Sequence, residues 1–146
     1  KMHIAQAAGC SPIVTAFEEG LTHFRPVVPN TVAKSLAIGN PADGFFALKT
    51  AESSGGSAVA APEDEILADI QLLAETEGIF TETAGGVVVS AVRKLAQCGA
   101  IEPDELTVAF ITGNGLKIQE TLSDTVQSLF TDPDYGSFIK VMGDRI

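Results

Sequence analysis

Three short apolar stretches of the chain are predicted to be buried strands. They are Met2–Ala8, Ser57–Ala60 and Leu106–Ile111, each rich in alanine or branched residues and followed by glycine or proline within a few positions. Ile79–Phe80 reads as a very short strand or an extended piece. The continuous apolar character of these runs is typical of strands covered on both faces.

Helices are predicted between the strands, because apolar residues recur there at three- and four-residue spacing. The clearest runs from Pro62 to Glu77, with Ile66, Ile70 and Leu73 on one face and Gly78 as its end. The other helices are expected from Ser11, as the N-cap, to about Glu19; over Thr31–Ile38 after Asn30; from the turn at Gly39–Gly44 to about Ser53; over Gly85–Gln97; and around Leu122, Val126 and Leu129.

Strands that alternate with helices indicate an α/β fold, with a parallel-type sheet covered by helices. The length of 146 residues and an apolar content of 45% fit one domain with a real core. We therefore expect a single α/β domain over residues 1–146, with 119–146 as a C-terminal tail or helix. The chain begins with Lys1 rather than Met, at the very start of a predicted strand, which a processed or tagged start or a cut from a longer protein would explain. We favour the second and expect the chain to be part of a longer protein.

Charge and cysteine content narrow the partners and the compartment. A formal net charge of -10 disfavours binding to nucleic acid or to anionic lipid. No apolar run approaches the roughly 18 residues that span a membrane. Cys10 and Cys98 are far apart and without a CxxC pattern, so we expect reduced thiols and a cytoplasmic protein.

Three polar, glycine-containing segments are candidates for chemistry. The turn Thr112–Gly115 directly follows a predicted strand, where α/β proteins bind ligands, and it offers one hydroxyl beside flexible backbone. Thr81–Gly86 enters a helix, whose free N–H groups attract anions. Gly39–Gly44 precedes another helix. A plain turn, a helix cap at Glu82 and a turn capped by Asp43 are the structural alternatives.

Metal and thiol chemistry have little support in the sequence. His3 and His23 lack neighbouring ligands, so no metal site is expected. Cys10 lies at a predicted helix start, where the helix dipole lowers a thiol pKa, but a small buried apolar residue is the alternative interpretation.

Four segments, taken in order, resemble the threonine synthases. They are QAAGCSPIV (Gln6–Val14), SLAIGNPADG (Ser35–Gly44), GGSAVAAPEDEILADIQLLAETEGIFTETAGGV (Gly55–Val87) and ITGNGLK (Ile111–Lys117). Together they span roughly residues 3 to 118 with family-like order and spacing. A single such segment would be weak support, whereas four in order are specific.

The resemblance implies a fold, a cofactor and a reaction. It implies part of the large domain of a fold-type II enzyme that uses pyridoxal 5′-phosphate (PLP). The implied reaction converts O-phosphohomoserine and water to threonine and phosphate, in a homo-oligomer without nucleic-acid or membrane partners. Thr112 would hydrogen-bond the pyridine nitrogen of PLP, and Gly113 would form the turn beside it. A neutral hydroxyl partner moderates the electron sink of the ring.

The chain also departs from the family pattern. The family's Schiff-base lysine lies in an SFKDRG-type motif, and no lysine of this chain does; its glycine-rich phosphate loop is absent too, and Gly39-Asn40-Pro41 does not replace it. We therefore expect no catalytic residue in these 146 residues, and neither activity nor bound PLP without further chain. Asn114 stands where many members have histidine.

Other functions stay open from the sequence. A related PLP enzyme that performs β-replacement, such as a cysteate synthase, would share these segments. A non-catalytic half-domain that binds a partner is a second class. Because half of an open sheet exposes an edge and apolar surface, we also expect self-association, or disorder near Thr112 and in the tail.

Overall fold

The computed structural model describes residues 1–119 and 129–143 of the chain. Its sheet has two parallel strands, β1 (Ile4–Ala7) and β2 (Ala58–Ala61). The helices are α1 (Pro12–Glu18), α2 (Gly44–Ser53), α3 (Ile66–Glu77), α4 (Thr83–Gln97) and α6 (Tyr135–Met142), with 3-10 turns η1 (Ala8–Cys10), η2 (Lys34–Leu36) and η3 (Gly115–Ile118). The α/β class expected from the sequence is confirmed.

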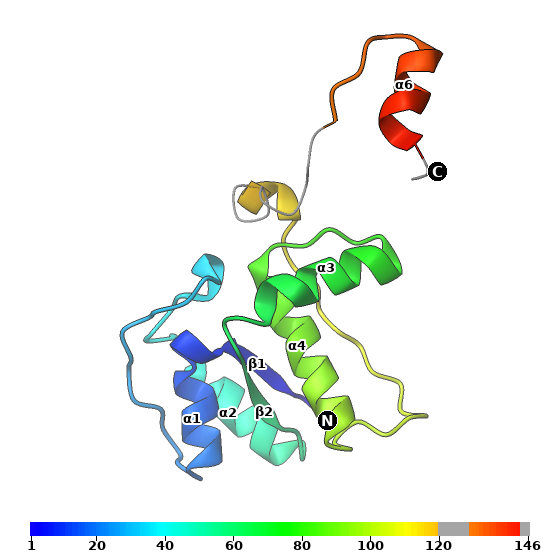
Figure 1. Cartoon of the computed structure of the whole chain (residues 1–146). Coiled ribbons are helices and arrows are strands. Elements are labelled where there is room, and N and C mark those ends of the chain that lie inside the picture. Colours follow the sequence, from blue (N-terminus) through cyan, green and yellow to red (C-terminus); the bar gives the residue numbers. More distant parts are fainter. Residues whose placement is uncertain (120–128, 144–146) are drawn as a thin grey trace.

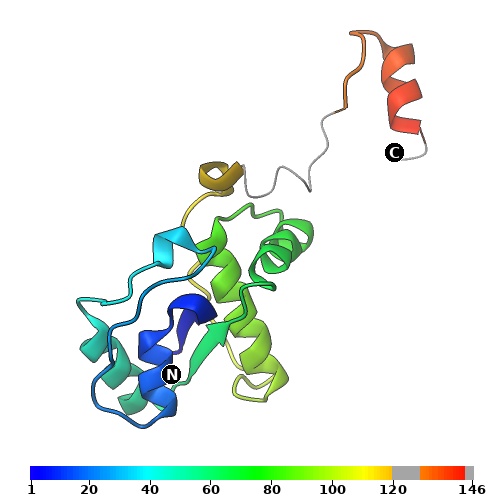
Figure 2. The ribbon, with the colours of Figure 1, turned by 60° about the vertical axis from the view of Figure 1, so that its left-hand side comes forward.

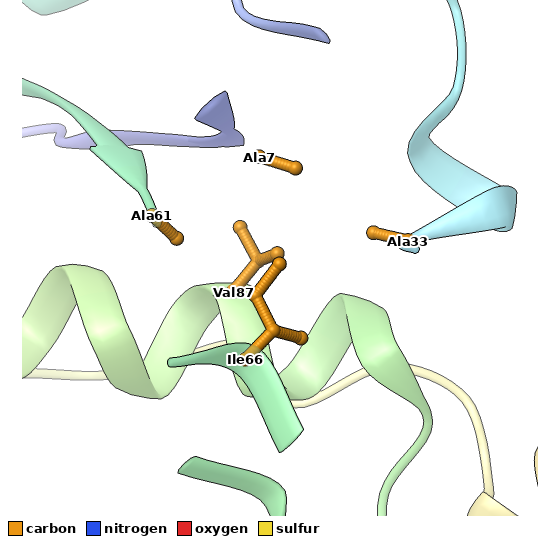
Figure 3. Packing of buried hydrophobic residues seen from close by; sticks show 5 residues of the cluster. All are labelled: Ala7, Ala33, Ala61, Ile66 and Val87. Carbon is orange, nitrogen blue, oxygen red and sulfur yellow. The ribbon is translucent and has the colours of Figure 1, made fainter. Parts of the chain in front are cut away.

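The sheet lies between two helical layers (Figures 1 and 2), with α1 and α2 on one face and α4, backed by α3, on the other. Successive residues of β1 serve opposite faces, as the two-residue period of a strand requires. Ala7 joins a cluster on the α4 side, shown in Figure 3, while Ile4 packs against the cluster on the α1 side. The first cluster comprises Ala7, Ala33, Ala61, Ile66 and Val87, and the second is built on Ile13, Ala16 and Leu48.

Helix α1 matches the predicted helix, but its N-terminus is held differently. The side chain of Ser11 accepts no cap hydrogen bond. Instead Gln6 Oε1, on β1, accepts from the backbone N–H groups of Ile13 at 2.9 Å and Val14 at 3.0 Å. A strand residue therefore satisfies two N–H groups that a helix start leaves without partners.

The helix predicted over Thr31–Ile38 is wrong; only the three-residue turn η2 forms there. The carboxylate of Glu63 accepts from the hydroxyl of Thr31 at 2.9 Å and from the N–H of Val32 at 2.8 Å. It also accepts from the N–H of Gly9 at 2.8 Å. These bonds hold the segment against η1 and the turn that precedes α3, so a tertiary contact replaces the local helix.

Helices α3 and α4 pack closely because glycine lies between them. A Cβ built on Gly86 would lie 2.5 Å from the carbonyl oxygen of Ile66 and 2.9 Å from Ile70 Cγ1. Arg93 on α4 reaches two carboxylates, Asp69 Oδ1 at 3.1 Å and Glu65 Oε2 at 3.0 Å. Helix α3 starts at Ile66 rather than at the predicted Pro62, while α4 includes the predicted Gly85–Gln97.

Two predicted strands do not form. Ile79–Phe80 is not a strand, although Thr81 next to it forms an isolated bridge with Asn114. The stretch Leu106–Ile111 is extended but belongs to no strand, and the side chain of Leu106 is 93% exposed to solvent. A strand needs a hydrogen-bonded neighbour, and no described segment lies at bonding distance to supply one.

The C-terminal region differs from the sequence expectation. Asp134 Oδ1 accepts from the N–H of Ser137 at 3.0 Å and caps α6, a helix that the pattern did not predict. The helix expected around Leu122 and Val126 lies outside the described residues. Among the helices described, none is both long and apolar enough to cross a membrane.

Candidate functional site

The turn Thr112–Gly115 is hydrogen-bonded to the segment that enters α4. Thr81 is fully buried, and its Oγ1 donates to the carbonyl oxygen of Gly113 at 3.1 Å and lies 3.4 Å from that of Thr112. The N–H of Gly115 donates to the carbonyl oxygen of Phe80 at 3.1 Å. The structure thus brings together two candidate segments that are about thirty residues apart in sequence.

Glycine is required at the centre of this turn. Gly113 has a φ of +78°, in the left-handed region that side chains disfavour. A Cβ there would lie 2.1 Å from Glu82 Oε1. The Glu82 side chain, only 8% exposed, therefore packs directly over Gly113.

Thr112 keeps its hydroxyl available. The residue is exposed, and its hydroxyl makes no hydrogen bond to the described part of the chain. The side chain of Asn114, by contrast, already has a partner, because its Oδ1 accepts from the N–H of Leu116 at 2.9 Å. The backbone of the turn is fixed by Thr81 and Phe80, so the Thr112 hydroxyl is presented from a rigid support.

The start of α4 supports this turn rather than forming an open anion site. Thr81, Glu82 and Thr83 are all buried, and Glu82 is the N-cap residue. Glu82 thus occupies the cap position that its structural interpretation predicts, although its carboxylate makes no cap hydrogen bond.

The segment Gly39–Gly44 forms a packed turn, as its structural interpretation predicts. The N–H of Val27 donates to the carbonyl oxygen of Gly39 at 3.0 Å, and Gly44 begins α2 against the ring of Phe24. Asp43 is the N-cap residue of α2, but its side chain accepts no cap bond. The third candidate therefore joins loops and offers no further chemistry.

The structure supports the interpretation of Cys10 as a small buried apolar residue. It is 2% exposed, and burial raises the pKa of its thiol, which is the opposite of what a reactive thiolate needs. Within residues 1–119 and 129–143, no three potential ligands among His, Cys, Asp and Glu gather at one point.

Sequence reasoning missed Thr81 as the residue that holds the candidate site. The TETAGG segment was interpreted as a helix entry, and no spacing rule links residue 81 to residue 112. The sequence offers only a threonine shortly before a predicted helix, and the burial of Thr81 is known from the structure alone.

The turn fits one edge of a PLP ring. A solvent-facing hydroxyl on fixed backbone matches the hydrogen-bonding need of a pyridine nitrogen, while the space beside Gly113 that a Cβ would fill is taken by Glu82. Of the chain's lysines, Lys1 pairs with Glu105 at 3.5 Å and Lys34 donates to the carbonyl oxygen of Thr31 at 2.8 Å.

Known proteins resemble this chain over most of its length. It is 42% identical to the threonine synthase of Methanocaldococcus jannaschii over 118 residues, covering 80% of this chain and 29% of that protein. The threonine synthase of Methanosarcina acetivorans is 40% identical over 128 residues, covering 87% and 32%. That of Mycobacterium leprae is 34% identical over 128 residues, covering 88% and 34%. The chain spans about a third of the length of these curated relatives.

A solved structure supports the fold independently. The structure of maize serine racemase superposes with a TM-score of 0.56 at 10% identity, covering 86% of this chain and 39% of that one. The expected fold-type II architecture is thereby confirmed. The family model described as pyridoxal-phosphate dependent enzyme matches residues 1–113. The chain therefore belongs to the pyridoxal-phosphate-dependent enzyme family.

Proposed function

We propose that this chain is the C-terminal part of a threonine synthase, a PLP-dependent carbon-oxygen lyase. The complete protein would convert O-phosphohomoserine and water to threonine and phosphate. Identity of 34–42% to threonine synthases over most of the chain supports the reaction. The observation that carries the chain's own role is the turn at Thr112, which is fixed by the buried Thr81 while its hydroxyl stays exposed.

In this proposal Thr112 and Gly113 are the cofactor-binding residues of the chain. PLP, when bound, supplies an electron sink that stabilises carbanions next to the substrate amino group. The Thr112 hydroxyl would hydrogen-bond the pyridine nitrogen and keep that nitrogen at a fixed position. Gly113 would let the backbone lie close to the ring, and Thr81 would act as a positioning residue for both.

The remaining parts of the proposal concern the whole protein. The Schiff-base lysine and the phosphate contacts would come from outside these 146 residues, so the chain alone would be inactive. Residues 1–146 would form one portion of the large domain, and the complete enzyme would be a cytoplasmic homo-oligomer.

A hybrid protein tests this function. The 118 matched residues of the M. jannaschii threonine synthase would be replaced by the corresponding part of this chain, and threonine and phosphate release from O-phosphohomoserine measured. The hybrid is expected to be active and to show the visible absorbance of bound PLP. Thr112→Val should lower kcat/KM by about 10- to 100-fold, as expected for loss of one hydrogen bond, and Thr112→Ser should keep most of it.

Thr22→Val is the matched control, because Thr22 is an exposed loop threonine whose hydroxyl, among the described residues, hydrogen-bonds only to the neighbouring His23. It should leave kcat/KM unchanged. A folded hybrid that binds PLP but forms no threonine would contradict the proposed reaction. Equal rates for Thr112→Val and the unsubstituted hybrid would contradict the role of the hydroxyl.

A further inference from the structure

Lys34 lies at the end of the sheet where α/β proteins bind their ligands. It begins η2, whose Leu36 packs against the buried cluster that contains Ala33 and, near the start of α4, Val87. Figures 1 and 2 show η2, the start of α4 and η3 at one end of the molecule, the end at which β1 and β2 finish. Ligands of parallel sheets bind at the carboxyl ends of the strands. Lys34 therefore shares this end of the sheet with the Thr112 turn.

A chain of hydrogen bonds ties the backbone before η2 to the end of β1. The carboxylate of Glu63 accepts from the N–H of Gly9 in η1 and from the hydroxyl of Thr31. Thr31 is only 5% exposed, and its Oγ1 also accepts from the N–H of Ala33 at 3.0 Å. The segment that carries Lys34 is therefore fixed by buried bonds.

The side chain of Lys34 is oriented by the same segment. Its Nζ donates to the carbonyl oxygen of Thr31 at 2.8 Å. An ammonium group has three N–H donors, so two are left for another acceptor. The side chain is exposed, and within residues 1–119 and 129–143 it forms no ion pair, although acidic residues outnumber basic ones by 19 to 9. The Glu63 carboxylate close by in the segment already accepts three hydrogen bonds.

An oriented ammonium group of this kind suits an oxyanion. Lysine binds phosphate and carboxylate as a point charge through short, charge-assisted hydrogen bonds. Because the Lys34 side chain is already held at Thr31, binding costs it less conformational freedom. The net charge of -10 repels an anionic ligand, and a cation at the ligand end of the sheet offsets part of that repulsion.

We propose that Lys34 is a substrate-binding residue that donates to an oxyanion of the substrate, with Glu63 and Thr31 as its positioning residues. The proposal rests on the proposed function, since O-phosphohomoserine carries two such groups, a phosphate and a carboxylate. Thr112 contacts the cofactor, and Lys34 contacts the substrate from a separate segment of the chain.

Kinetics of the M. jannaschii hybrid described above test this role. Lys34→Met removes the ammonium group and should raise KM for O-phosphohomoserine by about 10- to 100-fold with little change in kcat, as expected when a charge-assisted bond is lost from ground and transition states alike. Lys34→Arg keeps the charge and should keep most of the affinity. Lys49→Met is the matched control, because Lys49 is an exposed lysine on α2, and it should leave KM unchanged.

Calorimetric titration of the PLP-bound hybrid gives a readout without turnover. The probes are inorganic phosphate and, separately, L-threonine, whose only anionic group is a carboxylate. Lys34→Met should weaken one of the two by about tenfold or more. A loss for phosphate assigns Lys34 to the substrate phosphate, and a loss for L-threonine assigns it to the carboxylate. A hybrid that forms no threonine but shows such a loss would contradict only the proposed reaction.

The positioning role of Thr31 has its own test. Thr31→Val removes the hydroxyl that Glu63 holds and should raise KM, by less than Lys34→Met does, while kcat stays close to that of the unsubstituted hybrid. Thr31→Ser keeps the hydroxyl and should restore KM. An unchanged KM in a folded Thr31→Val hybrid would remove the positioning role.

Two results would overturn the role of Lys34. One is a Lys34→Met hybrid whose KM and whose affinities for phosphate and L-threonine all equal those of the unsubstituted hybrid. The other is an equal loss of affinity in Lys49→Met, which would show that only the overall charge of the protein matters.

Discussion

Gln6 shows how one side chain can fix both a strand and a helix. Its Oε1 accepts from Ile13 N and Val14 N, so β1 and the first turn of α1 have a shared anchor. The residue is polar within a run of alanines, which is the sign that a tertiary hydrogen bond holds it there. This contact sets the position of α1 against the sheet.

Replacing this amide by an apolar group should destabilise the chain. Gln6→Leu has a similar size but no acceptor, and leaves two partly buried N–H groups without a partner. We expect a loss of about 1–2 kcal/mol in the free energy of unfolding, measured by urea titration. Gln71→Leu, which removes only an exposed bond to Glu75, should cost a few tenths of a kcal/mol. Equal losses would show that Gln6 does not act as a cap.

Asp69 introduces a pH dependence at the residue scale. The carboxylate is fully buried between α3 and α4, and burial raises its pKa even though Arg93 opposes the shift. The unfolded chain therefore releases this proton at lower pH than the folded chain. The contribution of Asp69 to stability is complete below its unfolded pKa, about 3.9, and is lost as pH rises through the folded pKa.

Asp69→Asn should remove this dependence. The unfolding free energy of the unsubstituted chain minus that of the variant is expected to fall as pH rises from about 3 toward neutrality. Urea titrations across this range provide the measurement, with Asp64→Asn on an exposed position as the reference substitution. A difference that grew with pH would reverse the sign and show that the ion pair with Arg93 dominates burial.

At the scale of elements, the packing of α3 on α4 depends on Gly86. Alanine is favoured over glycine inside a helix by about 1 kcal/mol. Here, however, the added Cβ would meet the carbonyl oxygen of Ile66, which is backbone and cannot rotate away. The close contact therefore outweighs the helix propensity.

Gly86→Ala should destabilise the chain by about 1–2 kcal/mol after both effects are combined. Gly136→Ala in α6 is the control, since its nearest neighbour is the Asp134 side chain at 3.2 Å. That variant should leave the main unfolding transition unchanged. Thermal and urea unfolding check both variants, and a more stable Gly86→Ala would mean that the two helices can separate at little cost.

At the scale of the whole molecule, net charge and exposed apolar surface have opposite effects on self-association. The net charge of -10 repels a second copy, while the exposed side chains of 106–110 favour association. Salt screens the repulsion, with a Debye length of about 30 Å at 0.01 M and about 3 Å at 1 M.

The average mass of the chain alone should therefore rise with salt in sedimentation experiments at fixed protein concentration. Phe110→Asp should reduce this rise, because it places a negative charge among the exposed apolar side chains of residues 106–110. Val28→Asp, at a loop residue that is 92% exposed against 72% for Phe110, should reduce it much less. A monomer at every salt concentration would show that the exposed apolar side chains of residues 106–110 do not cause self-association.

Local sequence patterns predict the helices that the spacing of their own apolar residues defines. The periodicity at Ile66 and Ile70 and the run Gly85–Gln97 lead directly to α3 and α4, because an apolar stripe needs only the helix's own geometry. Thr31–Ile38 was predicted as a helix and is not, because Glu63 bonds to Thr31 and Val32 from another segment. Such long-range bonds leave no trace in local spacing.

The candidate site divides in the same way. The resemblance to the threonine synthases predicts Thr112 and Gly113 as cofactor contacts, and that role stays a prediction. The clamp by Thr81 could not be predicted, since it depends on a bridge between residues 81 and 114.

The sequence by itself determined the α/β class, the extents of β1, β2, α1, α2, α3 and α4 to within a few residues, and the family resemblance. These depend on residue type and on spacing along the chain. Only the tertiary structure decided that Gln6 caps α1, that Thr81 fixes the Thr112 turn and that 106–111 stays unpaired among the described residues. Each of these depends on which distant backbone groups meet, and hydrogen-bond partners across long sequence separations are set by the assembled fold.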